Sequence, residues 1–271
     1  SSRKVSETSL LNPSQVHKLH IFASMLLWAI LQTLTLFRLA SGSLDSVAWG
    51  HKASKPYLLF IGVNTAPGNV QERAEVRQSW VQAKHVSGPH PTVQYKFMVG
   101  WGEDDSEDEK MLSWDNATHR DFLRLPVREG YHNLVNKTIA MLRWFALEGN
   151  AHYVMKLDDD SFPNFRRLLP LLQQKADKKQ RFTYAGNVMM KRQPLTWGKE
   201  AQDPAVFHES SYPPYASGAG YLMGADLARL IFRDHYPMHI GMRLYTEDAN
   251  TGVWVHRENL TGTPIDYTNL D

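Results

Sequence analysis

The chain has 271 residues, a formal net charge of +2 and no cysteine. This length allows one well-packed domain with additional segments. Because the basic residues are scattered along the chain, the composition argues against a nucleic-acid-binding protein. The lack of cysteine excludes disulfide bonds, cysteine-ligated zinc and thiol catalysis.

An apolar segment near the N-terminus indicates a membrane anchor. The run Ile21–Phe37 would form a helix about 25 Å long, slightly shorter than a hydrocarbon core of about 30 Å. The positive charges before it favour a signal anchor with a cytoplasmic N-terminus over a cleaved signal peptide or a buried amphipathic helix. We therefore predict a cytoplasmic tail at 1–20, a transmembrane helix at 21–40, a stem at 41–55 and a folded domain at 56–271.

From Tyr57 onward, strand-like and helix-like segments alternate, which predicts βαβ units and a mainly parallel sheet. The expected strands are 57–63, 93–99, 121–127, 153–160 and 182–188. The expected helices are 70–83, 133–147, 164–178 and 225–233, with two more beginning in the acidic stretch 103–109 and at Glu247. The Tyr, Pro and Gly-rich residues 210–223 are expected to form a loop.

Three consecutive carboxylates, Asp158 to Asp160, end the strand expected at 153–160. In open α/β sheets, ligands bind beyond the carboxyl ends of the strands. Strand alternation would send Asp158 and Asp160 to one face and Asp159 to the other. Such a cluster favours a divalent cation shared with a substrate phosphate, or else a solvated acidic turn paired with nearby basic residues such as Lys156.

Further candidate residues lie before and after this triplet. Arg73 and Arg77 are one helical turn apart, which suits either a phosphate site or a solvated helix face. A Gly-rich stretch, Ser217–Tyr221, and a second acidic pair, Glu247 and Asp248, follow later in the chain. A metal-held nucleotide-sugar needs such parts: a cation for the leaving diphosphate, a separate carboxylate as proton acceptor and glycines that admit the sugar.

Five short blocks occur in the same order as in a known family. Together they resemble glycosyltransferase family 31, which contains β-1,3-galactosyltransferases and β-1,3-N-acetylglucosaminyltransferases. The five blocks are Arg73–Trp80, Glu129–Thr138, Lys156–Asp160, Tyr212–Tyr221 and Glu247–Gly252.

The resemblance implies an α/β fold of the GT-A type, with a Rossmann-like, mainly parallel sheet flanked by helices. It also implies a type II membrane protein of the Golgi apparatus, or of the endoplasmic reticulum, with Mn²⁺ and a UDP-sugar donor, UDP-galactose first. The expected reaction is hexose transfer with inversion, in β-1,3 linkage, to a glycan, glycoprotein or glycolipid acceptor. Homo- or hetero-oligomers are compatible with this expectation.

Residue by residue, the resemblance implies Asp160 as a direct Mn²⁺ ligand with Asp158 beside it, while Asp158 and Asp159 serve the ribose and the donor sugar. Asp248 is the expected general base, and Glu247 is the alternative. Residues expected to line or support the donor pocket, or to form its floor, are Arg73, Arg77, Lys137, Gly218, Ala219, Gly220 and Tyr221. Trp197 is expected either to stack on the acceptor or to pack in the core.

The chain departs from the family pattern at several positions. Ala216 stands where many members have a cysteine, and Val135 and Ala249 replace the usual Thr and Val. Members of the family also continue further beyond the second acidic motif, and that region can supply a histidine ligand to the metal. The candidate in this chain is His256. The domain is therefore compatible with C-terminal truncation. The alternative function is therefore a catalytically inactive, membrane-anchored carbohydrate-binding or scaffold protein of the same fold.

Three Asn-x-Ser/Thr sequons, at Asn116, Asn136 and Asn259, suit a domain in the lumen of the secretory pathway. Asn136 falls inside the helix expected at 133–147.

Overall fold

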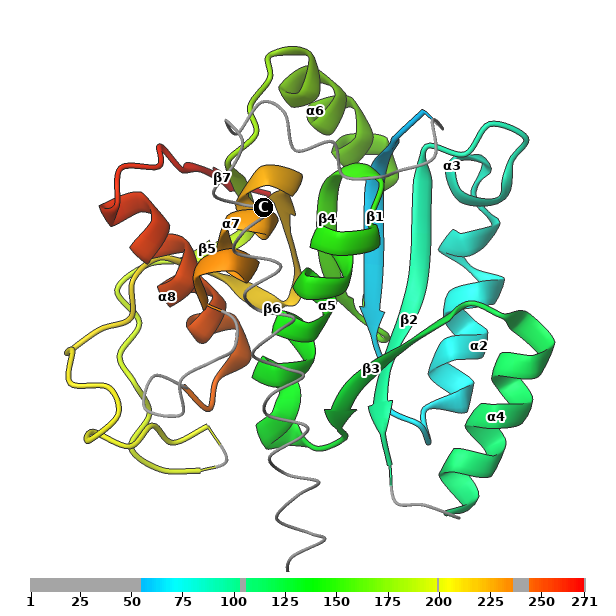
Figure 1. The fold of residues 1–271 in the computed structure, drawn as a ribbon, viewed down its shortest axis with the longest axis horizontal. Helices are drawn as coiled ribbons and strands as arrows, with labels where there is room; N and C mark the ends of the chain where they lie inside the picture. Colours follow the sequence, from blue (N-terminus) through cyan, green and yellow to red (C-terminus); the bar gives the residue numbers. More distant parts are fainter. Residues whose placement is uncertain (1–54, 103–105, 199, 236–243, 271) are drawn as a thin grey trace, which may run out of the picture. The chain divides into compact units, whose positions relative to one another are not determined.

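The computed structural model describes residues 55–102, 106–198, 200–235 and 244–270 (Figure 1). The predicted tail and transmembrane helix, and all of the predicted stem except Lys55, lie outside these residues. Within the described ranges, every helix is too short or too polar to cross a bilayer.

A seven-stranded sheet, in the order β3-β2-β1-β4-β6-β5-β7, forms the centre of the described part. The strands are β1 (Tyr57–Asn64), β2 (Val93–Trp101), β3 (Phe122–Arg128), β4 (Ala151–Asp158), β5 (Thr183–Met189), β6 (Tyr215–Gly224) and β7 (Asp266–Asn269). All neighbouring pairs are parallel except those of β6, which runs antiparallel to both β4 and β5. The prediction of a mainly parallel sheet is therefore confirmed.

Helices cover both faces of this sheet. They are α2 (Val70–Gln78), α3 (Lys84–Ser87), α4 (Glu107–His119), α5 (Leu134–Glu148), α6 (Phe165–Asp177), α7 (Ala225–His235) and α8 (Glu247–Leu260), with short 3-10 helices η1 (Trp80–Gln82) and η2 (Tyr131–Asn133). Buried side chains of α5, α7 and α8 pack on one face, and those of α2 and α6 pack on the other. The arrangement is consistent with a GT-A fold.

The two faces of β4 explain how this strand can be both a core element and part of a site. Tyr153, Met155 and Leu157 belong to the core on the side of α2 and α6, whereas Val154 belongs to the core on the side of α5, α7 and α8. Since strand side chains alternate with a period of two, Lys156 and Asp158 fall on the same side as Val154, where α8 lies.

One expected loop is a central strand. Residues 210–223 were expected to form a loop because glycines weaken strands, but from Tyr215 onward they form β6, between β4 and β5. The glycines allow close packing here: a Cβ atom at Gly220 would lie only 2.9 Å from Leu157 Cδ1. The prediction of a loop is wrong because these tertiary contacts outweigh the local preference.

Two other boundaries also differ. Strand β4 ends at Asp158, and a turn closed by the Ser161 amide, which donates to the Asp158 carbonyl at 3.1 Å, follows it. The expected strand alternation of the three carboxylates is therefore wrong. The helix expected at 70–83 ends at Gln78, because the backbone of Ser79 (φ −106°, ψ −110°) leaves the α-helical region, and the chain continues as the 3-10 helix η1.

Candidate active site

The acidic triplet lies at the topological switch point of the sheet. From β1 the chain continues to β2 and β3 on one side, and then returns to β4 on the other side of β1. Asn64 at the end of β1 and Asp158 at the end of β4 are neighbours, and Asn64 Nδ2 donates to Asp158 Oδ1 at 3.2 Å. Ligands of open α/β sheets bind at such a point, beyond the carboxyl ends of the strands.

The three carboxylates of the triplet have different surroundings. Burial raises the pKa of Asp158, although the Lys156 ammonium opposes this effect. Asp159 accepts a hydrogen bond of 2.9 Å from Asn69 Nδ2, in the loop that follows β1. Asp160 is exposed and accepts a hydrogen bond of 3.2 Å from the adjacent Ser161 hydroxyl. The triplet thus combines two anchored carboxylates with one that faces solvent.

The buried ammonium of Lys156 connects three elements of the site. Its Nζ lies 2.6 Å from Asp158 Oδ1 and 3.8 Å from Glu247 Oε2, and it donates to the carbonyl oxygen of Gly218 in β6. Burial lowers the pKa of Lys156, but Glu247 and Asp158 outweigh burial, so the pKa lies above its ordinary value. Sequence reasoning named Lys156 only as a partner of the triplet in an acidic turn and missed its contacts with Glu247 and Gly218. A lysine inside an otherwise buried strand was the available signal, because lysines are almost never buried without a partner.

Two adjacent carboxylates begin α8 and face different partners. Glu247 is buried, and its Oε1 accepts from the Tyr221 hydroxyl at 2.5 Å. Asp248 Oδ2 accepts from the Gly218 amide at 2.9 Å, and its Oδ1 accepts from the Ala249 amide at 2.8 Å. Burial, and after it the negative charge of Glu247, raises the pKa of Asp248 to about 6. A carboxylate with this pKa can accept a proton near neutral pH.

Antiparallel pairing explains why β6 belongs to this group. Tyr221 lies directly opposite Lys156 in the sheet, and directly opposed side chains share one face. Gly218 lies three positions earlier on β6, and a Cβ atom there would be 3.3 Å from Asp248 Oδ2. The structure thus brings together predicted residues from β4, β6 and α8, namely Asp158, Gly218, Tyr221, Glu247 and Asp248. The predicted Gly220 lies opposite Leu157, and a Cβ atom there would point at Leu157 and Met155, in the core on the other face of the sheet. Ala219 lies between the two glycines.

Arg73 and Lys137 hold the loop after β1. The fully buried Arg73 donates to the carbonyl oxygens of Ala66 at 2.6 Å and Pro67 at 2.9 Å, while its Nε pairs with Asp115 at 2.8 Å. Lys137 Nζ donates to the Thr65 carbonyl at 2.6 Å. Both side chains therefore support the loop whose Asn69 contacts Asp159.

Arg77 lies in an ion cluster at a different place. Its guanidinium pairs with Asp115 at 2.8 Å and with Asp121 at 2.9 Å. Asp121 directly precedes β3, so Arg77 connects α2 with α4 and the start of that strand. Among the described residues, its ion pairs do not include a member of the triplet. That Arg77 contributes to the donor pocket stays a prediction.

The buried ion pair of Arg73 predicts a stability effect. We expect Arg73→Met to lower the free energy of unfolding by about 3 kcal/mol, since it leaves Asp115 buried with fewer counter-charges and removes donors from the loop carbonyls. Urea unfolding of the purified protein measures this quantity. The exposed Arg166 serves as the matched control, with an expected change of at most about 0.5 kcal/mol for Arg166→Met. Equal effects of the two variants would contradict the prediction.

Two further predicted residues are Trp197 and His256. Trp197 has 78% of its surface exposed, so the interpretation as a core residue is wrong. His256 lies within α8, roughly 13 Å along the helix axis from Glu247.

The donor atoms at the triplet suit a hard divalent cation only in combination with a substrate. In the described ranges, no group of three or more histidine, aspartate or glutamate side chains could hold a metal ion. However, ions of this type are often held by one or two carboxylates together with substrate phosphate oxygens. Asp160 fits this pattern, since its carboxylate faces solvent and forms no ion pair with another described residue, and Asp158 begins the same turn.

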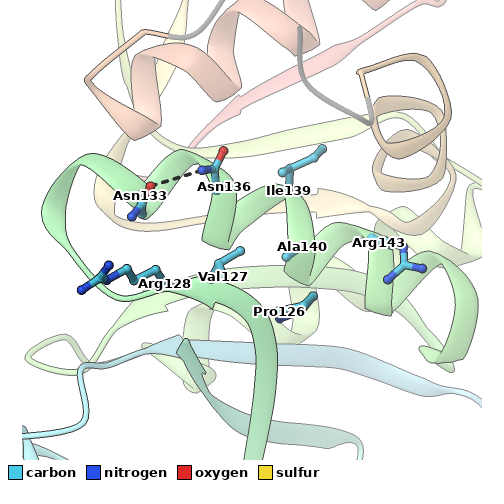
Figure 2. Close-up of a pocket in the computed structure, with 8 residues that line it drawn as sticks. All are labelled: Pro126, Val127, Arg128, Asn133, Asn136, Ile139, Ala140 and Arg143. Atoms are coloured by element: carbon cyan, nitrogen blue, oxygen red, sulfur yellow. Dashed lines mark hydrogen bonds between the residues drawn. The ribbon is translucent and has the colours of Figure 1, made fainter. Parts of the chain in front are cut away.

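A pocket of about 400 Å³ lies between β3 and α5 and is distinct from these residues (Figure 2). Figure 2 shows Asn136 of α5 hydrogen-bonded to Asn133, with Nδ2 donating to Oδ1 at 3.3 Å. None of the predicted site residues lines this pocket. Its lining consists of Pro126, Val127, Arg128, Asn133, Asn136, Ile139, Ala140 and Arg143.

Comparison with known proteins agrees with this architecture. The family model described as Galactosyltransferase matches residues 71–263. A hydroxyproline O-galactosyltransferase of Arabidopsis thaliana is 34% identical over 213 residues, which cover 78% of this chain and 31% of the relative. β-1,3-Galactosyltransferase 6 of Mus musculus is 31% identical over 224 residues, covering 82% of this chain and 67% of the relative.

A human relative, N-acetyllactosaminide β-1,3-N-acetylglucosaminyltransferase 2, is 29% identical over 214 residues, which cover 77% of this chain and 52% of the relative. The chain thus spans a little under a third of the length of the plant relative and about half that of the human one. Since the family match covers all five sequence blocks, including the strand-end carboxylates, the chain belongs to the galactosyltransferase family.

Proposed function

We propose that the protein is an inverting hexosyltransferase that moves galactose from UDP-galactose to an acceptor hydroxyl in β-1,3 linkage, with Mn²⁺ as cofactor. The observation that carries the proposal is the position of Asp248. This carboxylate, with a pKa of about 6, is joined through Gly218 and Lys156 to the acidic triplet at the switch point of the sheet. A proton acceptor and a diphosphate-binding position are thus joined by direct contacts.

In the proposed reaction, Asp248 acts as general base. It accepts the proton of the acceptor hydroxyl while the hydroxyl oxygen attacks the anomeric carbon of the donor. The bond from that carbon to the diphosphate oxygen breaks, and UDP leaves with the electron pair. When bound at Asp158 and Asp160, the cation would neutralise the charge that develops on the diphosphate. Lys156 holds Asp158, Glu247 and the Gly218 backbone in place around these groups.

Relatives support galactose as the first choice of donor sugar. The Arabidopsis and mouse relatives are named for galactosyl transfer, whereas the human relative is named for N-acetylglucosaminyl transfer. The direct test measures UDP release by the full chain with UDP-galactose or UDP-N-acetylglucosamine, with and without Mn²⁺. No release with any UDP-sugar from the folded protein would refute the proposal. Sugar binding without turnover would support the carbohydrate-binding or scaffold alternative.

We also propose that the domain lies in the Golgi lumen, anchored by residues 21–40, and this location predicts a pattern of N-glycosylation. Asn116 on α4 and Asn259 near the end of α8 are exposed, whereas Asn136 is half-buried and followed by the buried Lys137. A glycan on Asn136 would have to displace its hydrogen bond to Asn133 and enter the pocket of Figure 2.

On expression through a secretory pathway, Asn116→Gln and Asn259→Gln are each expected to remove one glycan, which is visible as a step in electrophoretic mobility. Asn136→Gln is expected to leave the mobility unchanged, and enzymatic removal of N-glycans should make all variants equal. The loss of a glycan in Asn136→Gln would contradict this expectation, which follows from the different exposure of the three asparagines.

A further inference from the structure

Three ring side chains form a continuous surface next to the start of α8. The Tyr131 and His132 rings of η2 lie 5.7 Å apart, and the His132 ring lies 5.5 Å from that of Tyr245, all in edge-to-face contacts. Tyr131 keeps 37% and Tyr245 keeps 41% of its surface exposed. We name Tyr131, His132 and Tyr245 the aromatic platform.

Residues of the long segment between β5 and β6 hold the aromatic platform from both ends. The Tyr131 hydroxyl donates to Glu200 Oε1 at 2.9 Å. The Tyr245 amide donates to Oε1 of the buried Gln202 at 3.1 Å. The Tyr131 ring and the backbone of Tyr245 are thus held in position, and the ring contacts with His132 connect them, as a preformed binding surface requires.

The aromatic platform lies within electrostatic reach of Asp248. Burial and then Glu200 raise the pKa of Tyr131 to about 12, and the charge of Asp248 contributes in the same direction. Tyr245 precedes Asp248 by three residues in the chain. A molecule resting on the platform would therefore lie near the candidate base.

We propose that the aromatic platform binds a sugar ring of the acceptor and thereby directs one of its hydroxyl groups toward Asp248. This proposal rests on the proposed function and adds an acceptor subsite to it. A pyranose has an apolar face of C–H groups that packs on aromatic rings, and hydroxyl groups around its edge that need polar partners. The platform offers both, since the tyrosine rings provide the apolar surface and the Glu200 carboxylate can accept several hydrogen bonds.

The polar groups favour a sugar over a prolyl ring. A hydroxyproline residue presents one hydroxyl group, whereas a pyranose presents several. The aromatic platform offers an imidazole and two phenol groups, and the carboxylate of Glu200 lies beside it. A glycan acceptor uses more of these groups than a hydroxyproline peptide does.

The test uses the full chain with UDP-galactose and two acceptors, p-nitrophenyl β-galactoside and a hydroxyproline-containing peptide. For the galactoside, Tyr245→Ala is expected to raise the acceptor KM about tenfold, while the KM for UDP-galactose changes less than twofold. Tyr245→Phe keeps the ring and is expected to retain an acceptor KM close to that of the unaltered protein. Trp114→Ala, which removes an exposed aromatic ring of α4, is the control and should change neither KM.

Each result separates the platform from the proposed function. If the unaltered protein releases UDP with the galactoside but Tyr245→Ala leaves the acceptor KM unchanged, the platform is refuted and the enzyme assignment stands. Use of the hydroxyproline peptide alone would also refute a sugar-binding platform. If Tyr245→Ala does not fold, Tyr131→Ala with the same two KM measurements decides between the outcomes.

Discussion

Asp248→Asn is expected to lower kcat for galactosyl transfer by about 10³-fold and to leave the protein folded. The amide oxygen of the variant can still accept the hydrogen bond from the Gly218 amide, whereas the hydrogen bond from the Ala249 amide is lost, so the contact between α8 and β6 can persist. The amide cannot take up the proton of an acceptor hydroxyl, and general base catalysis typically contributes about 10²- to 10⁴-fold. Initial rates of UDP release at saturating donor and acceptor measure the loss.

A matched control is available in α7. Asp226 is the second residue of α7, as Asp248 is of α8, and it pairs with Arg229 at 3.1 Å on a partly exposed surface. Asp226→Asn should leave kcat within about twofold of the unaltered protein, because it lies outside the candidate site. If Asp248→Asn kept more than a tenth of the activity, Asp248 could not be the base.

The pH dependence follows from the raised pKa of Asp248. The base must be ionised to accept a proton, so kcat is expected to be constant above pH 7 and to fall about tenfold per pH unit below its pKa of about 6. Glu247→Gln removes a neighbouring negative charge, which should lower the pKa of Asp248 and move this acidic limb to lower pH. A shift of the limb to higher pH would contradict the electrostatic explanation.

Asp160→Ala is expected to lower kcat/KM by at least about 10²-fold, because a bound metal ion contributes several kcal/mol to the stabilisation of transition-state charge. Its side chain is exposed, and its hydrogen bond within the described residues is the one from Ser161, so the midpoint of thermal unfolding should not change. Calorimetric titration with UDP, with and without Mn²⁺, provides a second measurement. The Mn²⁺-dependent part of UDP binding should disappear in the variant.

Asp177→Ala is the control for this substitution. Asp177 is also an exposed carboxylate that accepts one side-chain hydrogen bond, from Gln173 at 2.9 Å, but it lies at the end of α6. The Asp177→Ala substitution should leave both UDP binding and turnover unchanged. Equal Mn²⁺-dependent binding of UDP by Asp160→Ala and the unaltered protein would exclude Asp160 as a ligand of the metal.

Local sequence patterns determined the type and order of most elements. The uninterrupted apolar run of β1 predicts a strand covered on both faces, and the structure confirms it. The amphipathic period of residues 133–147 predicts α5 to within one residue at each end. The positions of the acidic triplet after β4 and of the Glu247–Asp248 pair at the start of α8 could also be predicted, because each depends on residues adjacent in the chain.

Tertiary structure alone decided how these pieces meet. Gly-rich β6 is a central strand because its neighbours require close backbone approach, which no local preference shows. Lys156 contacts Gly218, 62 residues away, and Asn64 contacts Asp158, 94 residues away. Such contacts depend on strand order and register, which are set by the packing of the whole sheet. For this physical reason the sequence indicated which carboxylates could take part in chemistry. The fold decided that Lys156 contacts Asp158 and Glu247, and that Arg73 holds the loop beside the acidic triplet.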